Sequence, residues 1–308
     1  MRIAFLGTPA FAVPALEALH RAGHTVVAVV AQPDRPAGRG QELRSPPTKA
    51  WAEAHGSPVL QPEKVRDGAL ARALSAHSPD LLAVVAYGRI LGRDLLELAP
   101  QGAVNVHASL LPRYRGAAPI QWAIAEGEKE TGVTVMQMDE GLDTGDILLQ
   151  RALAVGDDDA DGLARRLSVL GGEALVTALG LLEAGTVVPV RQDPARATLA
   201  RVLTKEDGRL DFALTAERLA RRIRAFRPWP GTYTTLAGRT LKVHAAAAEG
   251  DVGLGPGAAQ ADGAGILVGC GERSSLRLLE VQLEGKKRVA AADFLKGSPV
   301  RAGTVFGV

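Results

Sequence analysis

The sequence is poor in cysteine and in aromatic residues, and it has no long uninterrupted apolar run. Its 308 residues include one cysteine and an aromatic fraction of 4%, which excludes a disulfide scaffold and a cysteine-rich metal site. No stretch of about 18 apolar residues is available to cross a bilayer, and the amino-terminal MRIAFLGTP shows no cleavable signal pattern. These absences predict a soluble, cytoplasmic protein with no membrane partner.

The composition and the distribution of charge favour two folded domains. Apolar residues make up 46% of the chain, too many for a disordered protein, and a single core stops growing at roughly 250–300 residues. The net charge of +2 combines 20 basic and 23 acidic residues in 1–203 with 16 basic and 11 acidic residues in 204–308. The basic carboxyl-terminal third permits an anionic partner, although a basic domain without such a partner fits the charge equally well.

The first part of the chain alternates apolar strands with helices. Apolar or β-branched runs lie at 2–6, 25–30, 80–86 and 102–108. Such runs, joined by short helical connections, are typical of a parallel sheet covered on both faces. An amphipathic helix over 161–183 closes a predicted α/β domain of residues 1–189, with a Rossmann-like, mostly parallel sheet.

The last part of the chain follows a different pattern. Residues 190–206 have no sustained period and predict a linker. A helix at 215–225 then precedes short strands divided by glycine-rich turns, near 232–236, 239–247, 265–269 and 275–283. Short strands at this spacing favour a small β-barrel domain over residues 207–308.

Asn105 and His107 are the sharpest local signal for chemistry. They are two residues apart near the end of a predicted strand, so their side chains share one face of the sheet. Ligand sites in open parallel sheets lie beyond the carboxyl ends of the strands. An amide can donate to a carbonyl oxygen, and a histidine can exchange protons near neutral pH. A satisfied structural pair of polar residues fits the spacing equally well.

Two loops stand beside this pair in the predicted fold. Ser109–Gly116 contains proline, glycine and two arginines and predicts either an anion-friendly rim or an ordinary loop before a helix. Asp139–Asp146 carries four carboxylates, but its spacing does not match a calcium loop. One of its aspartates could hold the second ring nitrogen of the histidine; a solvated loop is the alternative.

Other features exclude functions or leave them open. Gly7-Thr8-Pro9 stands where a dinucleotide fingerprint would lie, yet the required glycines are missing, which argues against a nicotinamide cofactor. Cys270 has no histidine nearby in sequence and is interpreted as inert packing. The long loop 32–49 carries four basic residues among prolines and glycines, which indicates binding or a linker-like segment.

Taken together, these segments resemble the methionyl-tRNA formyltransferase family from end to end. The resemblance rests on FLGTPAFAVPAL, QPDRPAGRG, VVAYGRIL, NVHASLLPRYRGAAPIQWAI, TGVTVMQMDEGLDTGDIL, IRAFRPWPGTY and LEGKKR. The Asn-x-His and SLLPRYRG motifs are shared with other enzymes that use 10-formyltetrahydrofolate. QPDRPAGRG and RAFRPWP narrow the resemblance to the tRNA enzymes.

The resemblance implies formyl transfer from 10-formyltetrahydrofolate to the α-amino group of methionyl initiator tRNA, with no metal and no nicotinamide. It also implies that the carboxyl-terminal barrel is OB-like. It maps the catalytic group onto Asn105, His107 and Asp143. It implies folate contacts, many of them through the main chain, at Ser109, Leu110, Leu111, Pro112, Val85, Ala86, Tyr87, Gly88, Ile90 and Leu91.

The tRNA contacts are implied by the same resemblance together with the charge distribution. The inserted loop and the basic barrel supply the candidates Arg35, Arg39, Arg44, Arg221, Arg222, Arg224, Arg227, Lys286, Lys287 and Arg288. For any one of them, a solvated surface charge is an equally good interpretation. Two other functions stay open: a formyl-folate transferase acting on a small amine, and a non-catalytic RNA-binding protein.

Overall fold

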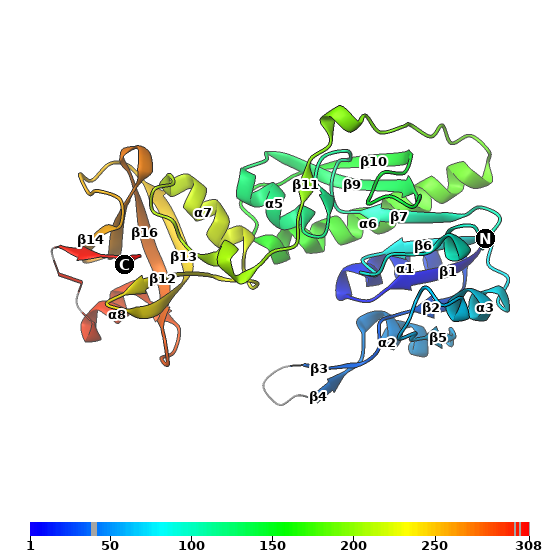
Figure 1. Ribbon diagram of the computed structural model, residues 1–308, viewed down its shortest axis with the longest axis horizontal. Coiled ribbons are helices and arrows are strands. Elements are labelled where there is room, and N and C mark those ends of the chain that lie inside the picture. The colour runs from blue at the N-terminus through cyan, green and yellow to red at the C-terminus, as the bar shows by residue number, and fades with distance from the viewer. Residues whose placement is uncertain (38–41, 299, 302, 308) are drawn as a thin grey trace. The chain divides into compact units, whose positions relative to one another are not determined.

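The computed structural model describes residues 1–37, 42–298, 300–301 and 303–307 (Figure 1). By its internal contacts the chain divides into two compact units. Unit 1 comprises Met1–Pro119, Glu130–Ala154 and Ala164–Arg201, and unit 2 comprises Ile120–Lys129, Val155–Leu163 and Val202–Val308. The predicted fold class, a mostly parallel sheet followed by a small barrel-like antiparallel sheet, is confirmed.

Unit 1 is built on a mixed sheet that, in the described residues, has seven strands in the order β10-β9-β7-β6-β1-β2-β5. Its strands are β1 (Arg2–Gly7), β2 (Thr25–Val30), β5 (Val59–Leu60), β6 (Leu81–Val85), β7 (Ala103–His107), β9 (Glu130–Gln137) and β10 (Ile147–Ala154). The pairs from β7 through β5 are parallel, whereas β9 and β10 are antiparallel. The predicted strands of this sheet are therefore confirmed.

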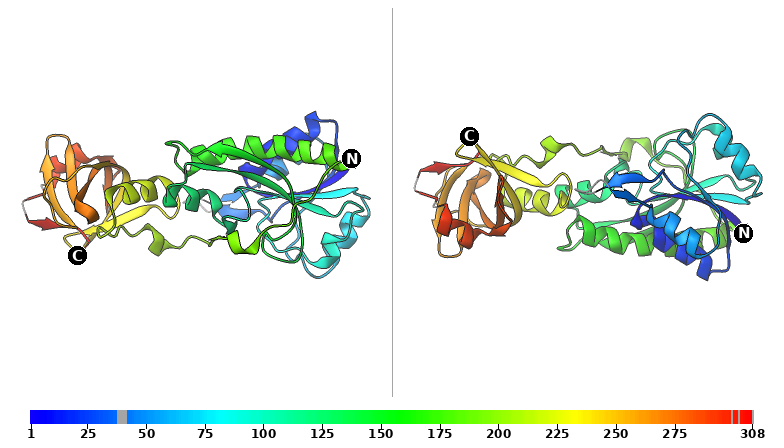
Figure 2. Two further views of the ribbon diagram at one scale, coloured as in Figure 1. Left: turned by 90° about the horizontal axis from the view of Figure 1, so that it is seen from above. Right: turned by 90° about the horizontal axis from the view of Figure 1, so that it is seen from below.

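Helices cover both faces of this sheet. In the described residues these helices are α1 (Val13–Arg21), α2 (Pro47–Ala54), α3 (Ala69–Ser75), α4 (Arg93–Leu96) and the long helix α6 (Ala160–Glu183). On one face Ala4 and Leu6 of β1 pack with leucines of α3 and α4. On the other face α6 lies beside α1 (Figure 2). Gly172 permits this close approach, because a Cβ at Gly172 would lie 2.8 Å from the Pro14 carbonyl oxygen, and Gly171 permits the approach of α6 to Val106 of β7, 3.0 Å from where its Cβ would lie.

Two short strand pairs lie outside this sheet. β3 (Arg35–Ala37) and β4 (Glu42–Arg44) form an antiparallel hairpin within the loop 32–49. At its base, Lys49 Nζ lies 2.8 Å from Asp34 Oδ2, and this hydrogen bond, with a second one from Gln61, holds the pKa of Asp34 below its usual value. β8 (Arg115–Gly116) pairs in parallel with β11 (Leu199–Ala200).

Unit 2 contains an antiparallel sheet in the order β12-β13-β16-β15-β14-β18, with β17 paired to β16, as far as the described residues show. Its strands are β12 (Thr232–Leu236), β13 (Arg239–Glu249), β14 (Ala258–Asp262), β15 (Gly265–Cys270), β16 (Ser274–Leu283), β17 (Val289–Ala290) and β18 (Thr304–Val305). Its α-helices in the described residues are α7 (Ala216–Ala225), α8 (Ala291–Gly297) and, apart from Pro119, α5 (Pro119–Glu126). The sequence pattern missed β14 and α8, because AAQAD and AADFLKG lack the apolar alternation or period that marks an element.

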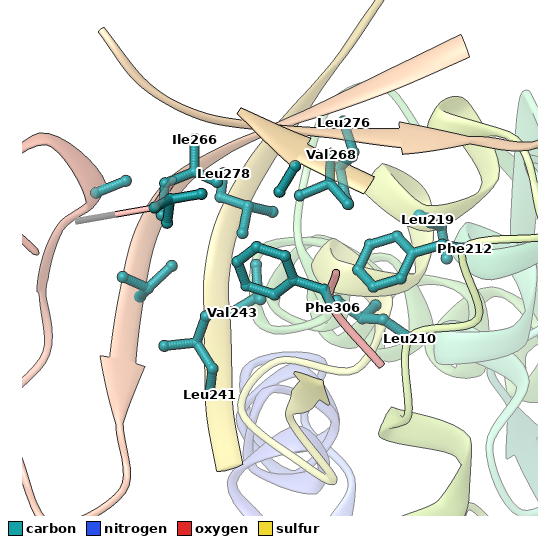
Figure 3. Close-up of a cluster of buried hydrophobic side chains, with 14 of the residues drawn as sticks. Leu210, Phe212, Leu219, Leu241, Val243, Ile266, Val268, Leu276, Leu278 and Phe306 are labelled. Atoms are coloured by element: carbon teal, nitrogen blue, oxygen red, sulfur yellow. The ribbon is translucent and has the colours of Figure 1, made fainter. Parts of the chain in front are cut away.

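The core of unit 2 lies inside the curled sheet. Phe212 and Phe306 pack edge to face there, with leucines and valines of β13, β15 and β16 around them and Leu219 of α7 at one side (Figure 3). Cys270 is buried at the same place, and burial raises the pKa of its thiol to about 11. A thiol with such a pKa stays protonated at neutral pH, so Cys270 acts as packing.

None of the helices in the described ranges combines the length and the apolar composition that crossing a membrane requires.

Candidate active site

The carboxyl ends of the parallel strands of unit 1 are tied together by side-chain hydrogen bonds. Gln32, just after β2, donates from Nε2 to the Tyr87 carbonyl oxygen at 2.9 Å, and its main-chain N–H donates to Thr8 Oγ1 at 3.1 Å. Thr48 donates to the Gly7 carbonyl oxygen at 2.8 Å. These bonds fix the loops that follow β1, β2 and β6 at the edge of the sheet where ligands bind in open α/β folds.

Asn105 lies on β7 with its amide available to a ligand. It is in register with Val84 of β6 and with Met136 of β9, and strand alternation places it on the same face as Ala103 and His107. Its side chain is half-buried and forms no hydrogen bond with any residue in the described ranges. An amide with no protein partner keeps both its N–H donors for an incoming polar atom.

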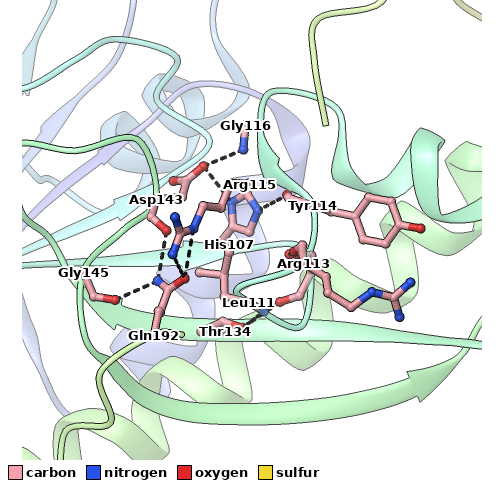
Figure 4. A network of polar contacts seen from close by, with 11 residues as sticks. His107, Leu111, Arg113, Tyr114, Arg115, Gly116, Thr134, Asp143, Gly145 and Gln192 are labelled. Atoms are coloured by element: carbon pink, nitrogen blue, oxygen red, sulfur yellow. Dashed lines mark hydrogen bonds and ion pairs between the residues drawn. The ribbon is translucent and has the colours of Figure 1, made fainter. Parts of the chain in front are cut away.

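His107 is buried, and both of its ring nitrogens face an oxygen (Figure 4). Nε2 lies 2.8 Å from the Tyr114 carbonyl oxygen and must donate there, because a carbonyl oxygen only accepts. Nδ1 lies 3.6 Å from Asp143 Oδ2. Nδ1 thus faces a carboxylate and Nε2 a carbonyl oxygen, and these two partners fix the orientation of the ring.

The loop Asp139–Asp146 places Asp143 beside His107. Asp143 has a φ of 52°, in the left-handed region that aspartate tolerates better than most residues, and its Oδ2 accepts from Gly116 N–H at 2.8 Å. Asp139 is bonded within the loop instead, to Gly141 N–H at 3.0 Å and to Thr144 Oγ1 at 2.7 Å. The loop is thus an internally bonded turn with one carboxylate turned to the histidine.

Thr134 of β9 holds the segment Ser109–Pro112. Its hydroxyl donates to the Ser109 carbonyl oxygen at 2.6 Å and accepts from Leu111 N–H at 3.1 Å. Ser109 and Leu111 are buried, whereas Leu110 and Pro112 are half-buried. Only the latter two therefore have side-chain surface to offer a ligand, and the former two shape the loop. The sequence patterns did not identify Thr134 as a site residue. The one signal that could have found it is that it is a polar residue in an otherwise apolar strand.

Exposed and buried residues alternate in the segment that follows β6. Ala86, Gly88 and Ile90 are exposed, while Val85, Tyr87 and Leu91 are buried, and burial raises the pKa of the Tyr87 hydroxyl. Beside this segment lies a cavity of about 610 Å³, lined by Gly88 and Ile90 and by the charged side chains of Glu63, Lys64, Arg66, Asp67 and Arg89. Exposed residues beside a cavity with three basic and two acidic side chains can bind a planar ligand that carries carboxylates.

Gln192 is a second residue that sequence reasoning missed. It lies in the predicted linker 190–206, yet it is buried and bonded to Asp143, Gly145 and Arg115 of unit 1. Residues 190–201 fall within unit 1 by their contacts. Nothing in the aperiodic sequence around Gln192 signals these contacts. The domain boundaries at 189 and 207 stay a prediction.

The predicted tRNA contacts divide into exposed and engaged side chains. Arg35, Arg44, Lys286 and Lys287 are exposed, and Arg39 falls outside the described residues. Arg222 donates to the Asp207 carbonyl oxygen, Arg224 donates to that of Asp158, Arg227 pairs with Asp159, and Arg288 pairs with Glu280. Arg221 is half-buried against Gly127. Lys286 and Lys287 form no ion pair with any residue that the structure describes, so they are more available to a partner than the paired arginines beside them.

Comparison with known proteins identifies the family. The model of the formyl transferase family matches residues 1–179, and that of the formyl transferase C-terminal domain matches residues 202–299. A methionyl-tRNA formyltransferase of Anaeromyxobacter dehalogenans strain 2CP-1 is 67% identical over 302 residues, covering 96% of this chain and 97% of that protein. One from Geobacter metallireducens is 50% identical over 309 residues, covering 100% and 99%.

A solved structure shows the same fold. An N-formyltransferase from Helicobacter canadensis, in complex with folinic acid and dTDP-3-aminofucose, superposes with a TM-score of 0.68 at 17% identity, covering 90% of this chain and 98% of that one. The resemblance drawn from the sequence motifs is confirmed by the two curated relatives and the two family models. The chain belongs to the formyl transferase family and, within it, to the methionyl-tRNA formyltransferases.

Proposed function

We propose that this protein transfers the formyl group of 10-formyltetrahydrofolate to the α-amino group of methionyl initiator tRNA, in the cytoplasm, for translation initiation. The observation that carries the proposal is the pairing of His107 with Asp143 on the sheet face that also bears the unbonded amide of Asn105. Relatives of at least 50% identity over nearly the whole chain carry the name of this activity.

The geometry supports a direct transfer. The amine attacks the formyl carbon, a C–N bond forms to the methionine nitrogen, and the bond from the formyl carbon to N10 of the folate breaks. Asn105 donates to the oxygen, which becomes negative in the tetrahedral intermediate. His107, whose Nε2 proton is held by the Tyr114 carbonyl oxygen, takes at Nδ1 the proton that the amine loses and returns it to N10. The Asp143 carboxylate, 3.6 Å from Nδ1, stabilises the ring while the ring is charged.

The proposed folate site lies along the exposed residues after β6. The pterin ring would bond to backbone groups at Ala86, Gly88 and Ile90, which are open to solvent. The cationic side chains of Lys64, Arg66 and Arg89 in the adjoining cavity suit the glutamate carboxylates of a folate. Gly88 has a φ of 74°, a conformation that favours glycine and turns this segment sharply after the buried strand. The absence of a metal and of a nicotinamide stays a prediction.

One assay tests the proposal and its two alternatives. Formyl transfer from 10-formyltetrahydrofolate is measured with charged initiator tRNA, with deacylated tRNA, and with free methionine and amino sugars as small amines. We expect product only with the charged tRNA. Transfer to a small amine alone would favour the small-acceptor alternative, and tRNA binding without any transfer would favour a non-catalytic RNA-binding protein.

We expect the exposed turn after β16 to contribute to tRNA binding. Replacing Lys286, Lys287 and Arg288 together by alanine is expected to reduce the slope of log K against log salt concentration by about 1 for each phosphate contact removed. The reason is that fewer counterions are released from the tRNA on binding when fewer phosphates are contacted. Affinity measured by filter binding between low and moderate salt gives the slope.

The matched control removes three positive charges from unit 1, through alanine substitutions at the exposed side chains of Arg21, Arg72 and Arg93. If the control changes the slope as much as the turn variant does, the effect is one of net charge. An unchanged slope in the turn variant contradicts the assignment of these three residues.

A further inference from the structure

We infer that Gln192 is a positioning residue for formyl transfer, which holds Asp143 in place beside His107. This inference rests on the proposed function, in which His107 and Asp143 act as a pair. In the described residues Gln192 forms no hydrogen bond with the ring of His107. It also forms none with the predicted ligand-binding segments 85–91 and 109–112. It can affect the reaction only through the residues to which it is bonded.

The amide of Gln192 has every hydrogen-bonding position filled (Figure 4). Nε2 donates to the Asp143 carbonyl oxygen at 2.9 Å and to the Gly145 carbonyl oxygen at 2.8 Å. Oε1 accepts from Arg115 Nε at 3.1 Å and from Arg115 Nη2 at 2.8 Å. An amide has two N–H donors and two acceptor lone pairs, so this side chain joins two loops with no bond left over. Its side chain is 6% exposed, which makes these bonds costly to break.

The two loops that Gln192 joins are those that contact His107. One of them carries Asp143, whose carboxylate faces Nδ1. The other carries Tyr114, whose carbonyl oxygen accepts from Nε2, next to Arg115. The buried amide therefore braces the two partners of the histidine, in addition to the direct hydrogen bond from Gly116 N–H to Asp143 Oδ2.

The chain segment around Gln192 is itself anchored to the second loop. Thr198 accepts from Tyr114 N–H through Oγ1 at 2.8 Å and from Arg115 N–H through its carbonyl oxygen at 2.8 Å. Val190, two residues before Gln192, exchanges main-chain hydrogen bonds with Ile147 at 2.8 Å. Gln192 thus lies on a segment held at both ends, which is the requirement for a side chain that positions others.

The test replaces Gln192 by methionine, which keeps the length and volume of the side chain and removes all four hydrogen bonds. We expect kcat to fall by about 10²-fold, because a displacement of about 1 Å in a reacting group can cost that much. The KM values for folate and charged tRNA should stay within about 3-fold of wild type, because Gln192 contacts neither proposed binding segment. Each rate is divided by the fraction of folded protein, which is obtained from the thermal unfolding of each variant.

The matched control is Gln137→Met. Gln137 also donates from Nε2 to two main-chain carbonyl oxygens, those of Gln101 at 3.3 Å and Ala103 at 3.1 Å, but at the opposite end of β7 from His107. We expect this variant to keep the wild-type kcat. Should Gln192→Met not fold, Gln192→Glu keeps the acceptor for Arg115 and removes the donors to Asp143 and Gly145, and the same loss is expected.

A double-mutant cycle separates positioning from a general structural role. In an Asp143→Ala background, Gln192→Met should lower kcat by less than about 3-fold, because the group that it positions is already missing. Multiplicative losses would overturn the inference, as would an unchanged kcat in Gln192→Met.

A readout without turnover keeps this inference separate from the proposed function. The six histidines of the chain are labelled with ¹⁵N, and the ring signals of His107 are followed by NMR. Gln192→Met should shift them and Gln137→Met should not; unshifted His107 signals in Gln192→Met would overturn the inference even if the wild-type protein formylated no acceptor.

Discussion

Replacing His107 by alanine is expected to lower the rate of formyl transfer by about 10²–10⁴-fold, the range that general acid–base groups contribute. The ring that carries the proton from the amine to N10 is then missing, and Asp143 is left without its partner at 3.6 Å. The affinity for charged tRNA should change little, because a histidine that is 6% exposed offers almost no surface to a macromolecule. Single-turnover transfer and equilibrium tRNA binding, measured on the same preparation, give the two quantities.

His20→Ala is the control for this substitution. His20 is an exposed histidine at the end of α1, where its ring packs edge-on against Trp51. The control should keep both the rate and the affinity. If His107→Ala lost its tRNA affinity together with its rate, His107 would be a structural residue and the proposed proton transfer would be wrong.

The arrangement of Asn105 and His107 could be predicted from the sequence because it depends on local geometry. Strand alternation over two residues places both side chains on one face, and the apolar run around them identifies the strand as buried. The structure confirms this strand as β7, Ala103–His107. The same argument predicted the neighbouring strands β1, β2 and β6, whose residues are apolar on both faces.

The contacts that fix this pair could not be predicted, because they join residues that are far apart in the sequence. Arg115 and Gln192 are 77 residues apart, and Gln192 and Asp143 are 49 apart. No period or motif of a single sequence encodes such a pairing. The segment 190–206, which has no sustained period and contains Pro194, therefore predicted a linker, although residues 190–201 are bonded into unit 1.

The availability of the basic residues to a partner could not be predicted from the sequence either. A count of charges identified the carboxyl-terminal third as basic, but it could not separate arginines engaged inside unit 2 from those open to a partner. Arg222 stacks over the ring of Phe226 at 5.0 Å and donates to Asp207, whereas Lys286 and Lys287 are exposed. Availability depends on tertiary contacts, and the charge pattern carries none of that information.

Replacing Asn105 by alanine is expected to lower kcat by about 10²–10³-fold, the loss typical of removing one donor to a developing oxyanion. Asn105→Asp should lose at least as much, because a carboxylate of nearly the same shape would face the negative oxygen with an acceptor. Thermal unfolding should change little for either variant, since the amide makes no hydrogen bond within the described part of the chain. A large drop in the unfolding midpoint, with the rate per folded molecule preserved, would make Asn105 a structural residue.

Asn105 is the only asparagine in the sequence, which allows a direct test of what its amide touches. Protein labelled with ¹⁵N at asparagine has a single side-chain NH₂ pair, so its two proton signals need no assignment. A folate that bears a formyl oxygen should move one of these two signals, because only one N–H can point at the oxygen, while tetrahydrofolate without the formyl group should not. Equal shifts with both folates would show that Asn105 senses the pterin and not the formyl oxygen, and the proposed oxyanion donor would then have to be another group.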